Sequence, residues 1–119
     1  MNDTPTPRTT QPHAPYLDDT AFRSAVEEKP GLAMIDFTAS WCGPCRAMAP
    51  HIDALSDELR GQVVIAKVDV DANPDLASRY GVQAFPTLLF FRDGKVVERA
   101  VGYASKHQLK ARIDAVRAA

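Results

Sequence analysis

The chain has 119 residues, the usual length of a single folded domain, so we expect neither a second domain nor an array of repeats. Hydrophobic residues make up 45% and charged residues 24% of the chain, which excludes disorder of the whole chain. The formal net charge of -1 argues against nucleic acid or a membrane surface as the main partner. The longest apolar runs, such as Leu88 to Phe91, are too short to span a membrane.

The N-terminal segment is rich in proline, since four of the nine prolines fall within residues 1 to 16. This composition predicts a disordered or extended N-terminal tail over residues 1–16, followed by one domain over residues 17–119. The end of the tail, His13 to Leu17, is a candidate for a short edge strand, where the missing N–H of proline is tolerated. The segment lacks the basic start and the apolar stretch of a signal peptide, so we expect a cytoplasmic protein.

Helix and strand patterns alternate along the first half of the domain. They predict, in order, a helix capped by Asp18 or Asp19 that runs through about Glu28, a strand over Leu32 to Thr38 and a helix over Gly43 to about Arg60. Pro50 lies inside the last of these and is expected to kink it, because proline removes one backbone hydrogen bond of the helix.

The alternation continues in the second half. The patterns predict a strand over Val63 to Val70, a short helix opened by Asn73 and Pro74 that runs through Tyr80, strands over Thr87 to Arg92 and Lys95 to Val101, and a last helix with a capping box formed by Ser105 and Gln108. Asp93 and Gly94 between the last two strands are a strong hairpin signal, so these strands should pair antiparallel.

This order of elements predicts an α/β fold with a central mixed β-sheet of four to five strands flanked by four helices. Functional sites in such sheets gather at the carboxyl ends of the strands. Cys42 stands at such a position, since it follows the strand over Leu32 to Thr38 and begins a helix. Cys42 and Cys45 are the only cysteines, and in a reducing compartment a disulfide between them is more often transient and catalytic than structural.

The cysteines belong to a five-residue motif, Trp41-Cys42-Gly43-Pro44-Cys45, which follows an apolar strand that contains a carboxylate. With this motif the chain resembles the thioredoxin family over roughly residues 17 to 119. The resemblance implies the thioredoxin fold, and it extends to further positions of the sequence, which are Asp36-Phe37, Pro50, Lys67, Asp69, Pro86-Thr87 and Gly102.

The spacing of the two cysteines suits reversible disulfide chemistry. Residues three apart on a helix have Cβ atoms about 5 to 6 Å apart, so a slightly loosened first turn lets this pair open and close. A cysteine at a helix N-terminus meets unpaired N–H groups and the positive end of the helix dipole, which favour the thiolate. We therefore expect Cys42 to be the attacking nucleophile and Cys45 to be the resolving thiol.

Two other interpretations of the cysteine pair are weaker. A structural zinc site needs four ligands, and beyond these two cysteines the sequence offers only isolated histidines and carboxylates, so we expect no metal. Two inert buried cysteines are also a poor fit, because the pair lies beside Trp41 at the start of a helix.

Asp36 interrupts an apolar strand that should be buried on both faces, so its carboxyl should be protonated or paired and its pKa raised. By resemblance to the family, Asp36 lies beneath the cysteine pair and serves as general acid and base for Cys45. Lys67, on the neighbouring strand, is a candidate modulator of Asp36, although a solvated position on the strand is an equally good interpretation.

The resemblance also implies a cis bond between Phe85 and Pro86 that packs against the cysteines, whereas the sequence alone fits a turn proline equally well. The backbone of Ala84 and Phe85 would then hold a substrate segment by main-chain hydrogen bonds, a mode that accepts many sequences. The expected substrate-binding surface is flat and apolar, and it comprises Trp41, Gly43, Pro44, Ala84, Phe85, Pro86, Gly102 and Tyr103.

Together these features predict a general protein disulfide reductase that acts on diverse disulfide-containing proteins, with a redox-active Cys42–Cys45 disulfide and no bound cofactor. No glycine-rich nucleotide motif is present in the sequence, so the electrons must come from another protein, and the resemblance implies an NADPH-dependent thioredoxin reductase. We expect the protein to be a monomer.

Two rival functions remain open from sequence. The first is a binding module in which thiol chemistry is incidental, and the second is a disulfide oxidase or isomerase of an oxidising compartment. The Gly-Pro pair between the cysteines argues against the oxidase. Thr38, Phe85 and Tyr103 depart from the commonest family pattern and leave the choice of partner open, while His51 fits a plain position on a helix surface.

Overall fold

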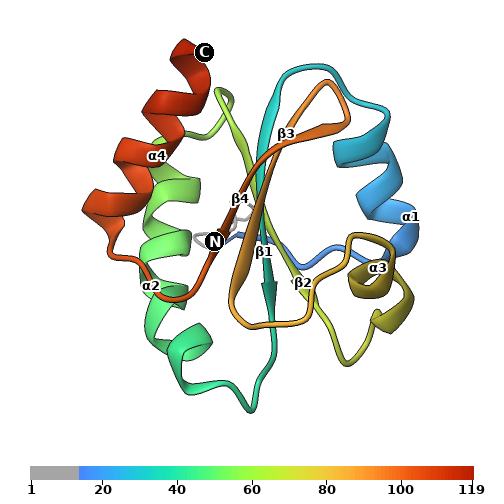
Figure 1. The fold of residues 1–119 in the computed structure, drawn as a ribbon. Helices are drawn as coiled ribbons and strands as arrows, with labels where there is room; N and C mark the ends of the chain where they lie inside the picture. The colour runs from blue at the N-terminus through green and yellow to red at the C-terminus, as the bar shows by residue number, and fades with distance from the viewer. Residues whose placement is uncertain (1–13) are drawn as a thin grey trace, which may run out of the picture.

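The computed structural model describes residues 14–119, in which a four-stranded sheet lies between two layers of helices (Figure 1). The elements in chain order are α1 (Asp19–Phe22), the π-helix η1 (Arg23–Glu27), β1 (Leu32–Thr38), α2 (Gly43–Glu58), β2 (Val64–Asp69), α3 (Pro74–Arg79), β3 (Thr87–Arg92), β4 (Lys95–Val101) and α4 (Lys106–Ala118). The predicted α/β class and the central mixed sheet flanked by four helices are confirmed.

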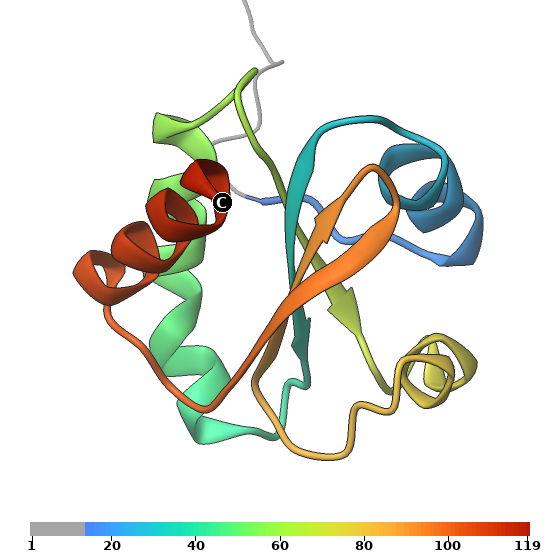
Figure 2. The same cartoon turned by 45° about the horizontal axis from the view of Figure 1, so that its top comes forward.

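The strand order of the sheet is β2-β1-β3-β4. β1 pairs parallel with β2 and antiparallel with β3, and β3 pairs antiparallel with β4. Helices α2 and α4 cover one face of the sheet while α1 and α3 cover the other, as the two views show (Figures 1 and 2). The helix that carries the cysteines therefore packs directly on the central strands.

The hairpin between β3 and β4 confirms the turn predicted at Asp93 and Gly94. Both residues have positive φ angles, 52° and 84°, as a two-residue hairpin turn of type I′ requires. A Cβ atom on Gly94 would lie 2.2 Å from the carbonyl oxygen of Glu27, so only glycine fits where the hairpin meets η1. The Asp93 carboxylate accepts a hydrogen bond of 2.7 Å from the backbone N–H of Gly31, which fixes the turn beside the start of β1.

Alternation along β1 divides the core into two clusters, because successive side chains of a strand point to opposite faces. Ile35 and Phe37 belong to the cluster that includes Phe22 of α1. Met34 belongs to the cluster that includes Ile52 of α2. Asp36 follows the same alternation as Met34, so its carboxyl lies on the face of the sheet that α2 and α4 cover.

The segment before α1 departs from the predicted edge strand. Among its described residues, only Tyr16 forms a bridge, which is parallel to Lys67 of β2. Two backbone hydrogen bonds of 2.8 Å accompany the bridge, from Lys67 N to Pro15 O and from Leu17 N to Lys67 O. The ladder extends no further because Pro15 has no N–H and the N–H of Ala14 donates to a side chain. Residues 1–13 of the expected tail lie outside the described residues.

The predicted helices hold with local changes. Asp18 caps α1 by accepting from the N–H of Ala21 at 2.8 Å, and the second half of that helical stretch is π-helical. Asn73 occupies the N-cap position of α3, but its side chain donates to the carbonyl of Asp69 and makes no cap bond. Pro50 lies inside α2, which continues past it to Glu58, and the capping box of α4 is present.

Candidate active site

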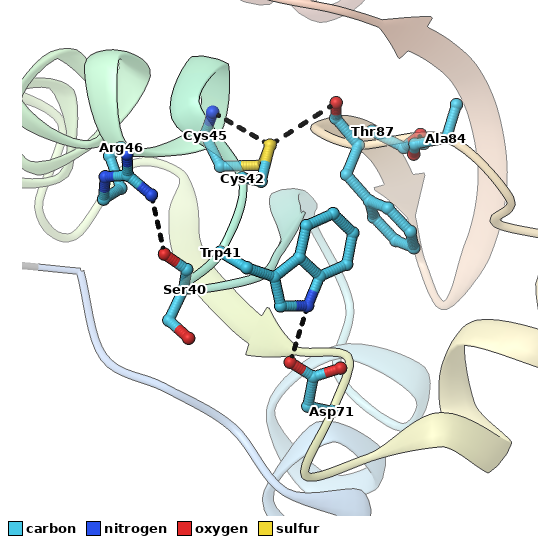
Figure 3. Close-up of a disulfide and its surroundings, with 9 residues drawn as sticks. Ser40, Trp41, Cys42, Cys45, Arg46, Asp71, Ala84 and Thr87 are labelled. Atoms are coloured by element: carbon cyan, nitrogen blue, oxygen red, sulfur yellow. Dashed lines mark hydrogen bonds between the residues drawn. A yellow bond between two sulfur atoms is a disulfide. The ribbon is translucent and has the colours of Figure 1, made fainter.

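Cys42 and Cys45 form a disulfide at the point where the carboxyl end of β1 leads into α2 (Figure 3). Their Cα atoms are 5.2 Å apart, which lies within the range that a disulfide spans. The Cys42 residue is 6% exposed and the Cys45 residue 1%, so Cys42 is the cysteine that an incoming molecule can reach.

The first turn of α2 supports negative charge on Cys42. This residue is the N-cap of the helix, and its sulfur accepts a hydrogen bond from the backbone N–H of Cys45 at 3.2 Å. Pro44 occupies the first turn, where no N–H is needed for the helix ladder. When the disulfide is reduced, this N–H and the positive end of the helix dipole favour the thiolate of Cys42.

The loop before β3 lies against the disulfide. The sulfur of Cys42 is 3.6 Å from the carbonyl oxygen of Phe85, and the peptide bond between Phe85 and Pro86 is cis, as the resemblance implied. The carbonyl of Pro86 accepts a hydrogen bond of 2.8 Å from the N–H of Gly102, which ties this loop to the end of β4. The sequence-predicted residues Phe85, Pro86 and Gly102 are therefore brought together beside Cys42.

Trp41 lies beside the cysteines with 62% of its surface exposed, which is unusual for the only tryptophan of a small domain. Its indole N–H donates to a carboxylate oxygen of Asp71 at 2.9 Å (Figure 3). The indole ring also meets the ring of Phe85 edge to face, with the ring centroids 5.7 Å apart. Sequence analysis missed Asp71. Its position just after β2, at the same edge of the sheet as Cys42, was the signal that marked it.

Tyr103 forms a second exposed aromatic position after β4, and its hydroxyl lies 3.0 Å from the imidazole Nε2 of His51 on α2. The two rings also pack edge to face at 5.9 Å. His51 lies on the surface of α2 and is partly exposed, as expected, but its contact with Tyr103 was not predicted. The sequence gives no signal for this contact, because it joins two elements that are distant in the chain.

Asp36 lies in the core under α2 and is 1% exposed, and its Oδ1 has no hydrogen-bond partner among the described residues. Its pKa is raised to about 7, in the predicted direction. Burial is the largest cause of this rise, while Lys67 lowers the pKa and Asp53 raises it. A carboxyl with this pKa exchanges a proton readily near neutral pH.

Lys67 is buried beside Asp36, since the two residues are paired across β1 and β2. Its ammonium nevertheless pairs with Asp53 of α2, whose Oδ1 lies 2.9 Å from Nζ. The interpretation of Lys67 as a solvated strand residue was therefore wrong. Sequence analysis also missed Asp53, because an acidic residue on an amphipathic helix gives no sign that it faces a lysine of the sheet.

No group of three or more histidine, cysteine or acidic side chains that could hold a metal ion occurs within residues 14–119. Over the same residues, no helix is both long and apolar enough to cross a bilayer.

Comparison with known proteins agrees with this site. The family model for thioredoxin matches residues 13–115. The thioredoxin of Allochromatium vinosum is 41% identical over 99 residues, which cover 83% of this chain and 92% of the relative. The thioredoxin of Chlorobaculum thiosulfatiphilum is 40% identical over 96 residues, covering 81% of this chain and 89% of the relative, and thioredoxin 1 of Synechococcus elongatus is 40% identical over 101 residues, covering 85% and 94%.

The chain belongs to the thioredoxin family. The family recognised from the Trp41-Cys42-Gly43-Pro44-Cys45 motif is thus confirmed. Members of the thioredoxin family are disulfide oxidoreductases, and the Cys42–Cys45 disulfide is the redox-active pair of this chain.

Proposed function

We propose that this member of the thioredoxin family is a general protein disulfide reductase and electron carrier, in which Cys42 attacks, Cys45 resolves and Asp36 moves the proton. The observation that carries the proposal is the disulfide at the N-terminus of α2, in which Cys42 is 6% exposed and Cys45 only 1%. The Cys42 sulfur lies beside the loop that contains Phe85, which supports binding of a partner segment at this place.

The first step is attack by the reduced protein on a partner's disulfide. The thiolate of Cys42 forms a bond to one sulfur of the partner, the partner's S–S bond breaks, and its second sulfur leaves as a thiolate that takes up a proton. The N–H of Cys45 and the dipole of α2 support this role, because they favour the charged form of Cys42 before attack.

The second step releases the partner. Asp36 accepts the proton of the Cys45 thiol, the Cys45 sulfur attacks Cys42, and the mixed disulfide breaks to give the Cys42–Cys45 disulfide and a second partner thiol. Two electrons have then passed to the partner. The raised pKa of Asp36, about 7, supports this role, since the carboxyl can both accept and return a proton at neutral pH.

The partner segment binds beside Cys42. The proposed contacts are the backbone of Ala84, Phe85 and Pro86 and the apolar surface formed by Trp41, Gly43, Pro44 and Gly102. The proximity of the Phe85 carbonyl to the Cys42 sulfur supports this placement. Main-chain recognition does not depend on partner side chains, so the range of substrates should be broad.

After each cycle the disulfide must be reduced again. We assign this step to an NADPH-dependent thioredoxin reductase, with the protein acting as a cytoplasmic monomer that binds no cofactor of its own. The family membership of the chain supports this assignment.

The test is reduction of the insulin disulfides with dithiothreitol as electron donor, compared among the wild type and two serine variants. Cys42→Ser should have no activity above the uncatalysed rate. Cys45→Ser should still attack but remain trapped as a mixed disulfide that is visible by mass spectrometry, because the resolving thiol is missing. Normal multiple turnover by Cys45→Ser would contradict the assigned roles.

A further inference from the structure

The buried Lys67 has two acidic neighbours and pairs with only one of them. Asp36 is its partner across β1 and β2, where adjacent strands lie about 4.8 Å apart and side chains on one face are in reach. Nevertheless, within the described residues no ion pair or hydrogen bond joins Lys67 to Asp36, and Oδ1 of Asp36 is left without a partner.

Asp53 holds the ammonium of Lys67 on the side of α2. Its Oδ1 lies 2.9 Å from Nζ of Lys67 and also accepts a hydrogen bond of 3.0 Å from the backbone N–H of Ala14. The Asp53 side chain is largely buried, so this pair is weakly screened by solvent. The carboxylate thus joins α2, β2 and the segment before α1 at one point.

The segment before α1 completes the enclosure of Lys67. The ring of Tyr16 lies over its ammonium, with Nζ 5.3 Å from the ring centroid, in the range of a cation–π contact. The backbone N–H of Lys67 donates to the carbonyl of Pro15, and the carbonyl of Lys67 accepts from the N–H of Leu17. The lysine is therefore held at its backbone as well as at its ammonium group.

We propose that Asp53 is a positioning residue for the proton transfer, which holds Lys67 away from Asp36 and thereby keeps the Asp36 carboxyl able to bind a proton. An ammonium that paired with Asp36 would fix the carboxyl in its charged form, and no proton would then be returned. This inference rests on the proposed role of Asp36 as the base for Cys45.

Few titratable groups face Asp36, so the effect of Asp53 on its titration can be separated from the effects of other groups. Lys67 approaches from β2 and Asp53 from α2. The opposing residue of β3 is Leu88, and the α4 residues of the same core cluster are Leu109, Ile113 and Val116, none of which titrates. The remaining titratable groups of the proposed reaction are the thiols of Cys42 and Cys45 in the reduced protein.

The experiment is a carbon-13 NMR titration of the aspartate carboxyl groups in the reduced full-length protein, with the Asp36 signal assigned from Asp36→Asn. In Asp53→Asn, which keeps the side-chain shape, Lys67 is released and the titration midpoint of Asp36 should fall by about one pH unit or more. Asp53→Glu keeps a carboxylate and should leave the midpoint close to that of the wild type. The matched control is Asp57→Asn, since Asp57 is an exposed residue of the same helix that pairs with Arg60.

A second comparison shows that Asp53 acts through Lys67. In a Lys67→Met background there is no ammonium to release, so adding Asp53→Asn should move the Asp36 midpoint much less than it does in the wild-type background. An unchanged or raised midpoint in Asp53→Asn, or an equal shift in both backgrounds, would overturn the proposal.

A kinetic readout separates this proposal from the role of Asp36. The pH profile for release of a mixed disulfide, followed by stopped flow, should shift to lower pH in Asp53→Asn by the amount that the NMR midpoint shifts. If Asp36→Asn releases its partner at the wild-type rate at every pH, the proposed base is wrong, while the NMR titration still decides whether Asp53 positions Lys67.

Discussion

Trp41 and Asp71 are joined by a hydrogen bond of 2.9 Å from the indole N–H to a carboxylate oxygen, although they lie 30 residues apart in the chain. The bond links the loop that leads into α2 with the loop that follows β2, and both loops lie at the end of the sheet where the disulfide is. It holds the exposed indole in one orientation beside Phe85, and so gives the proposed substrate surface a fixed shape.

Asp71→Ala should loosen Trp41 without affecting the cysteines. A hydrogen bond to a charged group contributes about 1.5 to 3 kcal/mol when well formed and less at an exposed site, so we expect kcat/KM for insulin reduction to fall about 3- to 10-fold. The reaction of the reduced protein with a small aromatic disulfide should be unchanged. Because Trp41 is the only tryptophan, its fluorescence anisotropy reports the loss of order directly. Equal losses with both substrates would place the effect on the cysteines instead.

The raised pKa of Asp36 makes stability depend on pH. The pKa is about 7 in the folded protein against an ordinary value of 3.8, so between these values the folded state binds a proton that the unfolded chain does not. Stability therefore falls as pH rises through this window and stays low above it. Asp36→Asn removes this loss, and should stabilise the fold by up to about 4 kcal/mol at about pH 8 and by little at about pH 4.

Urea unfolding of Asp36→Asn and the wild type across this pH range measures the effect. The same variant should release mixed disulfides slowly while attacking at close to the normal rate, because only release needs the base. A gain in stability that is independent of pH would show that the carboxyl is not the group that titrates.

Deletions at the N-terminus should separate the tail from the segment that contacts the sheet. Removal of residues 1–12 is expected to leave activity and melting temperature nearly unchanged, because the sequence offers no apolar stripe there. Removal of residues 1–17 also takes away the buried Ala14 and Leu17 and the hydrogen bonds to Lys67 and Asp53. This longer deletion should cost about 3 kcal/mol or more in urea unfolding, and equal stability of the two deletions would contradict the contacts described.

Much of the fold could be predicted because the signals are local. The bounds of Leu32–Thr38, Thr87–Arg92 and Lys95–Val101 were predicted to the residue, since apolar runs end at small or turn-forming residues. The Ser105–Gln108 capping box likewise marked the start of α4. The cysteine pair and its place at a helix start followed from the same local reasoning.

The contacts between elements could not be predicted from local sequence signals. The pairing of Lys67 with Asp53 depends on how α2 lies across β2. The contact of Tyr16 with Lys67 depends on an isolated bridge in the segment where an edge strand was expected, and the strand pattern did not indicate a ring over the lysine. From the sequence, Lys67 was either a modulator of Asp36 or a solvated strand residue, and neither interpretation pointed to Asp53. Packing of α2 on the sheet decides which acidic residue pairs with Lys67. The strand register alone would have favoured Asp36, which lies opposite Lys67.

The contact between His51 and Tyr103 supports a last prediction, about the choice of partner. Tyr103 is half exposed and follows Gly102, so its ring is a candidate extension of the proposed substrate surface. His51 fixes that ring by the hydrogen bond of 3.0 Å and by the edge-to-face contact. A fixed ring offers apolar area to a partner at little entropic cost.

Tyr103→Ala should therefore raise KM for insulin about 3- to 10-fold with kcat little changed, since the ring contributes binding and not chemistry. Tyr103→Phe and His51→Ala each remove the hydrogen bond but keep the ring, so each should have a smaller effect, and the double variant should be no worse than either one. His107→Ala, on the exposed first turn of α4, is the matched control and should behave as the wild type. Additive effects of Tyr103→Phe and His51→Ala would mean that the two residues act separately, and an unchanged KM in Tyr103→Ala would remove Tyr103 from the substrate surface.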